Sequence, residues 1–229
     1  MTNSQKAFEY LKNTDVIKTK RLTLSKPTVE EMEILAEYLL DEDVCKNFIG
    51  GAILNQGKDT ILSNFKNLEK NEAFFVIKNQ NNDIVGDVGY VFIEEDNVIE
   101  IGGFIAKPFW GNEYIEEADF AVWLKLREVS TDFITCLSTA DFNEKSKRAI
   151  KKGLKMLNKM GLSYSIEEDF INWTAEVVLN TDGETVEVKY YKGGTYLYQK
   201  TRPKSMVRWD VLKDNKFDMR SVNYKITTS

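Results

Sequence analysis

Four segments of the chain place apolar residues at helical spacing. The clearest begins at Thr28, where Glu31 completes a capping-box pattern. Amphipathic helices are predicted over Thr28–Leu39, Lys58–Leu68, Ile115–Val129 and Asn143–Met160. The Gly50-Gly51 pair marks a loop between the first two, and Met1–Lys18 is expected to add little regular structure.

Alternating or continuous apolar runs predict strands in the same part of the chain. These strands cover Lys20–Ser25, Ala73–Lys78, Ile84–Ile93, Val98–Lys107 and Phe133–Thr139. Turn-rich segments separate the second, third and fourth of them, which predicts an antiparallel meander. After the fourth strand, Gly111 leads into a helix, and a strand, glycine loop and helix in this order can present backbone N–H groups to an anion.

After Leu162 the sequence pattern changes and predicts mainly β-strands. Asn180-Thr181-Asp182-Gly183 is a hairpin signature, and it lies between the strand-like runs Trp173–Leu179 and Glu184–Tyr191. Further strands are predicted over Thr195–Lys200 and Met206–Leu212. We therefore divide the chain into an α/β domain over residues 1–165 and a β-rich C-terminal extension over residues 166–229, packed on or beside it.

The amino-acid composition restricts the possible catalytic chemistry, and it says less about the fold. The 229 residues include no histidine, which excludes imidazole as a base, as a partner of a nucleophile or as a metal ligand. Only Cys45 and Cys136 are present, and they form no CxxC pair, so neither a zinc site nor a disulfide framework is expected. The net charge of −5 argues mildly against attraction of nucleic acid by the whole surface.

No apolar stretch reaches the ~18 residues that a membrane span needs. The first residues, Met1 to Gln5, lack a basic region followed by an apolar core, so no secretory signal is readable. A cytoplasmic location without membrane contact is the expectation.

Four segments together resemble the GNAT acetyltransferases. They are residues 19–24 (TKRLTL), 84–89 (IVGDVG), 100–118 (EIGGFIAKPFWGNEYIEEA) and 143–146 (NEKS). Within that family they resemble the branch that acetylates N-terminal amines of ribosomal proteins and related small-molecule or antibiotic amines. The resemblance covers about residues 19–162 and implies a mixed, mostly antiparallel central sheet flanked by helices, with acetyl-CoA as co-substrate and an amine as acceptor.

The same resemblance implies a cofactor site in the loop before the helix at Ile115 and in the following NEKS turn. Its expected members are Phe104, Ile105, Trp110, Gly111, Asn112, Tyr114, Ile115 and Asn143. Glu113 departs from the family pattern, because it stands where a second glycine is usual and brings a carboxylate close to the diphosphate. The Glu113 side chain can point away to solvent, and Lys107, Asn112 or Lys145 can compensate for the lost turn, so the affinity for acetyl-CoA is in doubt but not abolished.

Two residues are candidates for catalysis. Glu100 lies in mid-strand between two isoleucines, where a carboxylate is unusual, and is the expected general base. The alternative is a strand residue that points to solvent or pairs with a lysine. Backbone N–H groups near Phe104 and Ile105 would hold the oxyanion. Ile150 replaces the tyrosine that many family members use to protonate the leaving thiolate, so Ser146 or water takes that role. Ser146 is alternatively an ordinary residue of a first helical turn.

Two features keep other interpretations open. Trp110 either stacks on the cofactor or packs beside Pro108 and Phe109. The tail segment 189–208 has six basic residues and no acid, interleaved with tyrosines, which suits either a protein or nucleic-acid partner or a solvated sheet edge. A homo-oligomer is open as well. The alternative to an enzyme is a GNAT-fold module with a decayed cofactor loop and a role in assembly or binding.

Overall fold

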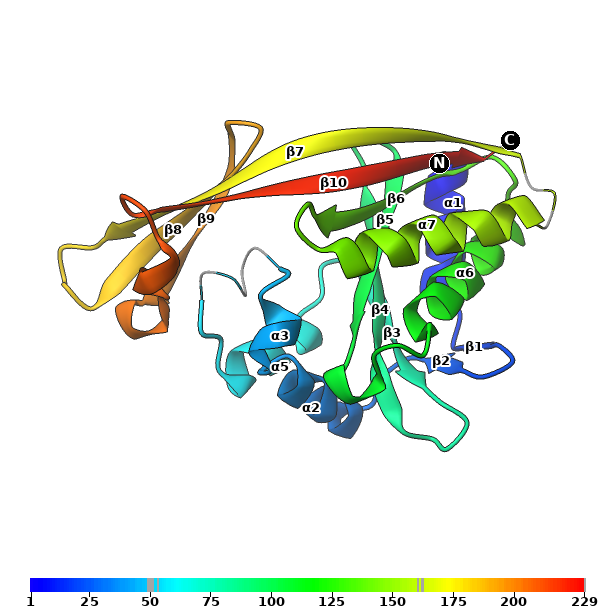
Figure 1. The fold of residues 1–229 in the computed structure, drawn as a ribbon, viewed down its shortest axis with the longest axis horizontal. Helices are drawn as coiled ribbons and strands as arrows, with labels where there is room; N and C mark the ends of the chain where they lie inside the picture. Colours follow the sequence, from blue (N-terminus) through cyan, green and yellow to red (C-terminus); the bar gives the residue numbers. More distant parts are fainter. Residues whose placement is uncertain (49–51, 53, 160, 162, 229) are drawn as a thin grey trace.

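The computed structural model describes residues 1–48, 52, 54–159, 161 and 163–228. Its named strands form one ten-stranded sheet in the order β1-β2-β3-β4-β5-β6-β10-β7-β8-β9 (Figure 1). The strands are β1 (Val16–Lys18), β2 (Thr23–Ser25), β3 (Glu72–Lys78), β4 (Ile84–Ile93), β5 (Val98–Ile105), β6 (Ile134–Ala140), β7 (Tyr164–Leu179), β8 (Thr185–Lys192), β9 (Thr195–Pro203) and β10 (Lys216–Thr228). The neighbours pair antiparallel except β5 and β6, which are parallel, so the predicted fold class is confirmed.

Helices cover both faces of strands β3 to β5. The larger helices are α1 (Asn3–Lys12), α2 (Val29–Tyr38), α5 (Lys58–Lys66), α6 (Tyr114–Arg127) and α7 (Glu144–Lys159), with the short α3 (Glu42–Cys45) between α2 and α5. In Figure 1, α1, α6 and α7 lie on one face of the meander, and α2, α3 and α5 lie on the other. Successive strand residues therefore enter different clusters: Phe75 packs towards α1 and α6, whereas Phe74 packs towards α2 and α5.

The N-terminal segment is more regular than the sequence predicts. Residues 3–12 form α1, whose N-cap Thr2 accepts a hydrogen bond from the backbone N–H of Gln5. Ala7, Phe8 and Leu11 are buried against the meander, and Phe8 stacks on Phe92 with ring centroids 5.8 Å apart. A helix of this length is too short to be stable through helix propensity alone, so packing of its apolar face against the meander stabilises it. The expectation of little structure before residue 18 is wrong.

Strands β5 and β6 separate towards their carboxyl ends. They pair from Ile99–Thr135 to Ile101–Leu137, and within the described residues no pairing continues to the end of β5 at Ile105. Beyond Ile101 the strands diverge, and the loop that follows β5 leads through a 3₁₀ turn at Lys107–Phe109 into α6. The divergence leaves backbone groups of β5 facing a gap between the two strands.

The last strands form a long arm. β7 and β10 pair with each other from Thr228–Tyr164 to Lys216–Glu176, and β10 also pairs with β6. Beyond the core sheet they carry β8 and β9, and we call residues 173–217 the hairpin arm. Its small core includes Ala175, Val188 and Tyr190. The predicted boundary after residue 165 stays a prediction, and both β7 and β10 continue from the core sheet into the arm (Figure 1).

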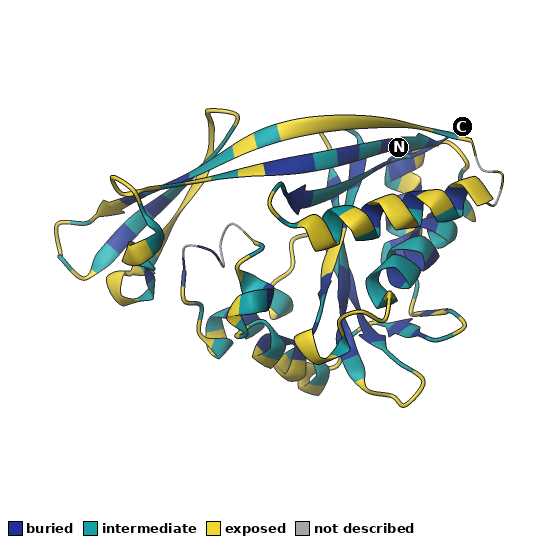
Figure 2. Cartoon of the chain, viewed as in Figure 1, coloured by how far each residue is buried: buried dark blue, intermediate teal, exposed yellow. Residues whose placement is uncertain are grey.

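Two details of the arm correct the sequence prediction. Residues 206–212 contain parts of two 3₁₀ turns, Lys204–Met206 and Trp209–Val211, in place of a strand. The final strand β10 was not predicted, although Val222, Tyr224 and Ile226 alternate with polar residues and are buried. The arm is mainly half-buried or exposed, in contrast to the buried centre of the meander (Figure 2). The predicted Gly50-Gly51 loop lies outside the described residues.

Candidate active site

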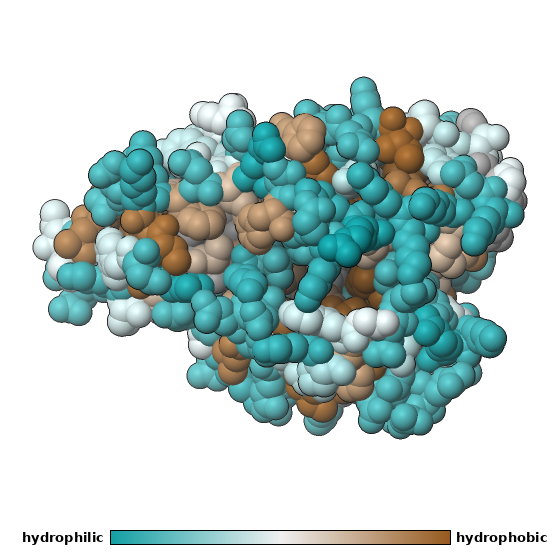
Figure 3. All heavy atoms as spheres, viewed as in Figure 1, coloured by the Kyte–Doolittle hydropathy of each residue, from teal (hydrophilic) through white to brown (hydrophobic). Residues whose placement is uncertain are grey.

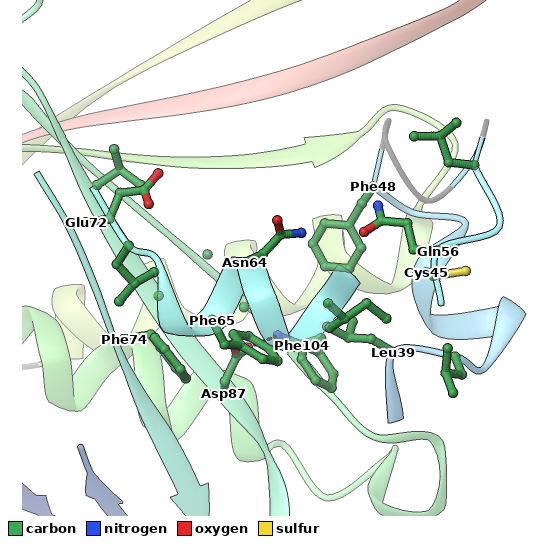
Figure 4. A pocket seen from close by; sticks show the side chains of 18 of the residues that line it. Leu39, Cys45, Phe48, Gln56, Asn64, Phe65, Glu72, Phe74, Asp87 and Phe104 are labelled. Atoms are coloured by element: carbon green, nitrogen blue, oxygen red, sulfur yellow. Dashed lines mark hydrogen bonds between the residues drawn. The ribbon is translucent and has the colours of Figure 1, made fainter. Parts of the chain in front are cut away.

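A large pocket lies between the meander and helices α2, α3 and α5. Its volume is about 810 Å³. Leu39, Phe48, Phe65 and Phe74 are among its walls, and Gly89, Gly102 and Gly103 belong to the side formed by the strands (Figure 4). Because glycine has no side chain, these positions leave room in front of the sheet. The volume suits an organic molecule of moderate size.

Three carboxylates that line this pocket form no ion pair with a basic side chain among the described residues: Glu72, Asp87 and Glu100. Asp87 is 8% exposed and accepts a hydrogen bond from the backbone N–H of Phe104 at 3.2 Å. Burial raises the pKa of Asp87 to about 7, while the hydrogen bond from Phe104 opposes that rise. A carboxylate with a pKa near neutrality is suited to proton transfer at physiological pH.

The predicted base, Glu100, lies two strand positions before Gly102 and also lines the pocket. It is half-buried and pairs in register with Val91 of β4 and Cys136 of β6. Glu100 therefore borders the pocket, and its role as general base stays a prediction. The pocket therefore has two candidate bases, and Asp87 is the more deeply buried.

Asp87 was missed from the sequence, although the signal was readable. It stands in the apolar run from Ile84 to Ile93, where a carboxylate is as unusual as Glu100 is in the next strand. A second missed residue is Arg208 of the hairpin arm, which lines the pocket and bonds to Glu42 of α3 at 2.9 Å. Only the fold brings Arg208 to this site, because it is distant in sequence from every other lining residue.

The hairpin arm also fixes the loop that borders the pocket. Leu54 forms an isolated antiparallel bridge with Val207, and the backbone N–H of Asn55 donates to the carbonyl of Met206 at 2.7 Å. Leu54 and Val207 are buried together with the core of the arm. One wall of the pocket therefore depends on a segment of the tail that the sequence alone assigned to a separate extension.

The predicted cofactor loop adopts a conformation that can hold an anion. Glu113 has φ of 61° and precedes α6 as its N-cap, so this position takes the left-handed conformation that a glycine would adopt more easily. Its carboxylate pairs with Lys152 of α7, which lowers the pKa of Glu113. The sequence did not indicate Lys152 as the partner of this carboxylate, and compensation by Lys107, Asn112 or Lys145 stays a prediction. The first N–H groups of α6 have no helical partners.

Most of the other predicted cofactor residues gather around this loop. The Trp110 indole N–H donates to the carbonyl of Ile105 at 2.6 Å, and the Lys145 ammonium lies 4.6 Å from the centre of its ring. Trp110 is 37% exposed, so it does not fill the core. Asn112 donates to the Phe109 carbonyl at 2.9 Å. Tyr114 and Ile115 are half-buried against the main core, and Gly111 has a φ of 84°.

The backbone donors expected near Phe104 and Ile105 are not equivalent. The Phe104 N–H faces β4, where it bonds to Asp87, so it is not directed at the gap between β5 and β6. Successive N–H groups of a strand point to opposite sides, and those of Gly103 and Ile105 therefore point towards the gap. The expected oxyanion donor Phe104 is corrected to its neighbour Gly103, and Ile105 remains a candidate.

The NEKS turn opens α7 as predicted. The Asn143 side chain accepts a hydrogen bond from the backbone N–H of Ser146 at 3.1 Å, which is an N-capping contact. Ser146 is half-buried, and Ile150 is 8% exposed in the core. The Asn143 side chain is therefore engaged in capping α7. The role of Ser146 in proton transfer stays a prediction.

Other site classes find little support in the part of the chain that the structure describes. It contains no group of three or more Asp, Glu or Cys side chains arranged to hold a metal ion. Cys45 and Cys136 are both half-buried and not joined in a disulfide, and burial raises the pKa of Cys136 to about 11. None of the described helices is long and apolar enough to cross a membrane.

A model of the acetyltransferase (GNAT) domain matches residues 21–153, more than half of the chain. The chain belongs to the GNAT acetyltransferase family. A curated relative, an uncharacterized N-acetyltransferase p20 of Bacillus licheniformis, is 29% identical over 109 residues, which are 45% of this chain and 61% of that protein. The matched part thus spans about three fifths of the length of this relative.

Solved structures of low sequence identity share the GNAT fold. One is RimL, a ribosomal L7/L12 α-N-protein acetyltransferase in complex with coenzyme A, with a TM-score of 0.54, 10% identity and coverage of 91% of this chain and 97% of that one. Another is the spermidine N-acetyltransferase from Vibrio cholerae in complex with CoA and spermine, with a TM-score of 0.54, 11% identity and coverage of 90% and 95%. Both comparisons cover about nine tenths of this chain.

Proposed function

We propose that this GNAT chain transfers an acetyl group from acetyl-CoA to a primary amine with an apolar body, with Asp87 as general base. The observation that carries the proposal is the buried Asp87 carboxylate in the wall of a pocket of about 810 Å³. The pocket lies on β3 to β5, and the carboxyl end of β5 diverges from β6 before the chain enters α6. A carboxylate with a pKa of about 7 is matched to taking a proton from an amine near neutral pH.

The residues present fit a diphosphate-bearing acyl donor. The N-terminus of α6 offers backbone N–H groups and the positive end of the helix dipole, and Lys145 stands over Trp110 beside it. The charge of Glu113, which would repel a diphosphate, is paired with Lys152. Acetyl-CoA supplies the acetyl group as a thioester, and the gap between β5 and β6 is the proposed path of its thiol arm.

The proposed chemistry assigns one task to each residue of the site. Asp87 takes a proton from the acceptor ammonium, which leaves a neutral amine. The amine nitrogen attacks the thioester carbon and the C–S bond breaks, and the second proton that the nitrogen loses passes to the leaving sulfur. The N–H groups of Gly103 and Ile105 point to the gap, where they would stabilise negative charge on the thioester oxygen. Glu100 and Glu72 would hold the acceptor ammonium in the pocket before transfer. Ser146 is the candidate to return a proton to the leaving sulfur.

The proposed acceptor class follows from the pocket walls. Aromatic and aliphatic side chains line most of the pocket, and the three carboxylates at the strand side provide its negative charge. An amine that carries an aryl or branched alkyl group would bury this apolar surface, whereas a linear polyamine would desolvate charge against it. A small amine, or a protein N-terminus with a large apolar first residue, fits this description. The predicted ribosomal-protein specificity and cytoplasmic location remain predictions.

The second candidate, a non-enzymatic module with a decayed cofactor loop, is less well supported. A decayed site is expected to be filled by side chains, yet this pocket is large and the strands beside it diverge. Glu113 was the main argument for decay. It adopts the left-handed conformation of the expected glycine and has its charge paired.

The test is release of the CoA thiol, measured with purified protein, acetyl-CoA and three acceptor classes: arylalkyl amines, spermidine and peptides with free N-termini. We expect arylalkyl amines to give kcat/KM values about tenfold or more above spermidine. Asp87→Asn should lower kcat by about 10²-fold while acetyl-CoA still binds in calorimetry. Glu100→Gln is the matched control and should act mainly on KM for the amine.

The pH dependence sharpens the assignment of the base. Because the pKa of Asp87 is raised to about 7, kcat/KM should increase with pH through this value, as the carboxylate loses its proton. If Glu100→Gln abolishes this increase and Asp87→Asn does not, Glu100 is the base. Absence of both thiol release and acetyl-CoA binding at millimolar ligand would overturn the proposed function as a whole.

A further inference from the structure

Two edges in the C-terminal part of the sheet are open in the described chain. β8 pairs with β7 only from Trp173 to Leu179, so no described strand pairs with residues 164–172 of β7 on the side away from β10. β9 pairs with β8 on one side and is the last strand at one end of the sheet, opposite β1. Unpaired edges of this length present rows of backbone N–H and C=O groups to another strand.

The exposed side chains on both edges are partly apolar. Residues 165–170 of β7 are all exposed, with Ile166 at 42% and Phe170 at 52%. On β9, Leu197 is 42% exposed and Tyr198 is 44% exposed. Figure 3 shows hydrophobic residues on the arm face among hydrophilic ones. Apolar side chains along an unpaired backbone edge are the combination that single folded chains usually avoid.

The open edge of β7 and the outer edge of β9 match in length and in position along the sheet. The turn between β8 and β9 lies at the inner end of the open β7 edge, where the backbone N–H of Gly193 donates to the carbonyl of Asn172 at 2.7 Å. β9 has nine residues, and the open stretch Tyr164–Asn172 has the same length. β9 lies two strand positions outward from β7, on the other side of this turn.

We propose that two copies of this chain form a symmetric dimer in which β9 of each copy pairs with the open edge of β7 of the other. Rotation of a second copy by half a turn, about an axis perpendicular to the sheet between the two arms, brings each β9 against the β7 of its partner. The strands are then antiparallel, β8 and the incoming β9 lie end to end along β7, and both open edges are used at once.

Charge supports this pairing over the alternatives. The open β7 edge carries Glu167, Glu168 and Asp169, whereas β9 carries Lys200 and Arg202 and no acid. In the proposed direction the basic half of β9 lies along the acidic half of the β7 edge, and Leu197 lies near Phe170. Pairing of β9 with β9, or of β7 with β7, would place like charges close together. The two-fold arrangement is therefore the complementary one.

The dimer would also stabilise the pocket. The hairpin arm supplies Arg208 to the pocket and holds the loop at Leu54 and Asn55. In a dimer, each arm would be fixed along its outer strand by the partner as well. This inference does not depend on the proposed function, because it rests only on the two edges and their charges.

Charge reversal tests the proposal, with mass measured by light scattering after size exclusion and by sedimentation velocity. We expect the wild-type chain to be dimeric at micromolar concentration. Two variants should each be monomeric: Lys200→Glu with Arg202→Glu, and Glu167→Lys with Glu168→Lys. A one-to-one mixture of these two variants should form dimers again, because both contacts of the mixed pair then join opposite charges. Only a dimer in which β9 of each copy contacts β7 of the other predicts that the two monomeric variants form dimers when mixed.

The matched control is Lys151→Glu with Lys155→Glu, which makes the same change of charge on the exposed face of α7 and should leave the dimer intact. Circular dichroism verifies that each variant is folded. A monomeric wild type at 100 μM, an open series of larger oligomers, or variants that remain dimeric would overturn the proposal. Variants that stay monomeric when mixed would overturn the reciprocal pairing.

Discussion

The two faces of strands β3 to β5 use the same backbone for different purposes. Towards α1 and α6, large side chains such as Phe75 and Tyr90 fill the interior. Towards α2 and α5, glycines and acids leave a pocket of about 810 Å³. Each face carries an aspartate whose pKa is raised to about 7 by burial: the half-buried Asp119 of α6 on the first and the buried Asp87 of β4 on the second. A buried carboxylate therefore indicates a function only when it faces a space that a ligand can enter.

The largest expected difference between the two faces is in the loss of stability when Phe75 or Phe74 is replaced by alanine. Phe75→Ala should lower the free energy of unfolding by about 3–5 kcal/mol, because it leaves a closed cavity between Tyr90 and the rest of the main core. Phe74→Ala should cost less, because Phe74 lines the pocket and its removal enlarges a space that already exists. Urea unfolding of both variants measures this difference. Equal costs would show that the pocket face is packed as closely as the other.

The comparison also shows how far the sequence could predict the fold. The alternation of apolar residues in Ala73–Lys78 and Ile84–Ile93 predicts strands with two buried faces, and the structure confirms them as β3 and β4. α1 was missed because its apolar residues are few and its stability comes from packing on Phe92, which the local pattern does not contain. Tertiary contact of this kind outweighs local propensity.

The site was less predictable than the fold. The loop at Trp110–Ile115 could be located by its motif, and Glu100 by its unusual place in a strand. The ion pair of Glu113 with Lys152 and the position of Arg208 arise from contacts between distant segments, which no local pattern records. Whether Asp87 lies in a pocket depends on the glycines of the neighbouring strand and on the helices that cover them.

The second prediction concerns Asp119. Its side chain is half-buried, its Oδ1 atom is buried without a hydrogen-bond partner among the described residues, and burial together with Glu116 raises its pKa to about 7. A raised folded-state pKa gives stability that is fully present below the unfolded value near pH 4 and is lost as pH rises through about 7. Asp119→Asn should therefore stabilise the chain by about 1–3 kcal/mol at pH 8 and by much less at pH 4.

Thermal or urea unfolding across pH 4 to 8 measures the difference between Asp119→Asn and the wild type. Asp87→Asn is the comparison on the other face and should show a similar trend in stability, since its pKa is raised as well. The two variants should differ in activity, because only Asp87 lines the large pocket. An unchanged difference in stability between pH 4 and pH 8 would place the Asp119 carboxylate in contact with water.

The third prediction uses two adjacent glycines of β5. A Cβ at Gly102 would meet nothing within 4 Å, whereas a Cβ at Gly103 would collide with the carbonyl oxygen of Asp87. Gly102→Val should fold normally and fill part of the pocket, and we expect KM for the amine to increase about tenfold with little change in acetyl-CoA binding. Gly103→Ala should instead destabilise the pairing of β4 and β5. An unchanged KM in Gly102→Val would remove the pocket as the acceptor site.

The smallest expected effect is at Glu113, where the conformation and the charge of one residue can be separated. Glu113→Gly places the preferred residue at a φ of 61° and should stabilise the chain by about 1 kcal/mol. It also releases Lys152, whose charge then faces the N-terminus of α6 without a partner. CoA should bind about three- to tenfold more tightly at low salt, and the gain should decrease as salt rises.

Lys152→Gln is the matched control for the charge, because it leaves Glu113 unpaired next to the same helix terminus. CoA affinity should fall in this variant, while the left-handed conformation of Glu113 stays as it is. Calorimetry of both variants and the wild type at two salt concentrations separates the two effects: a gain in Glu113→Gly that persists at high salt is conformational, and one that disappears is electrostatic. Equal CoA affinities in all three proteins would mean that the Glu113–Lys152 pair faces away from the diphosphate, and the site would then depend on the α6 backbone alone.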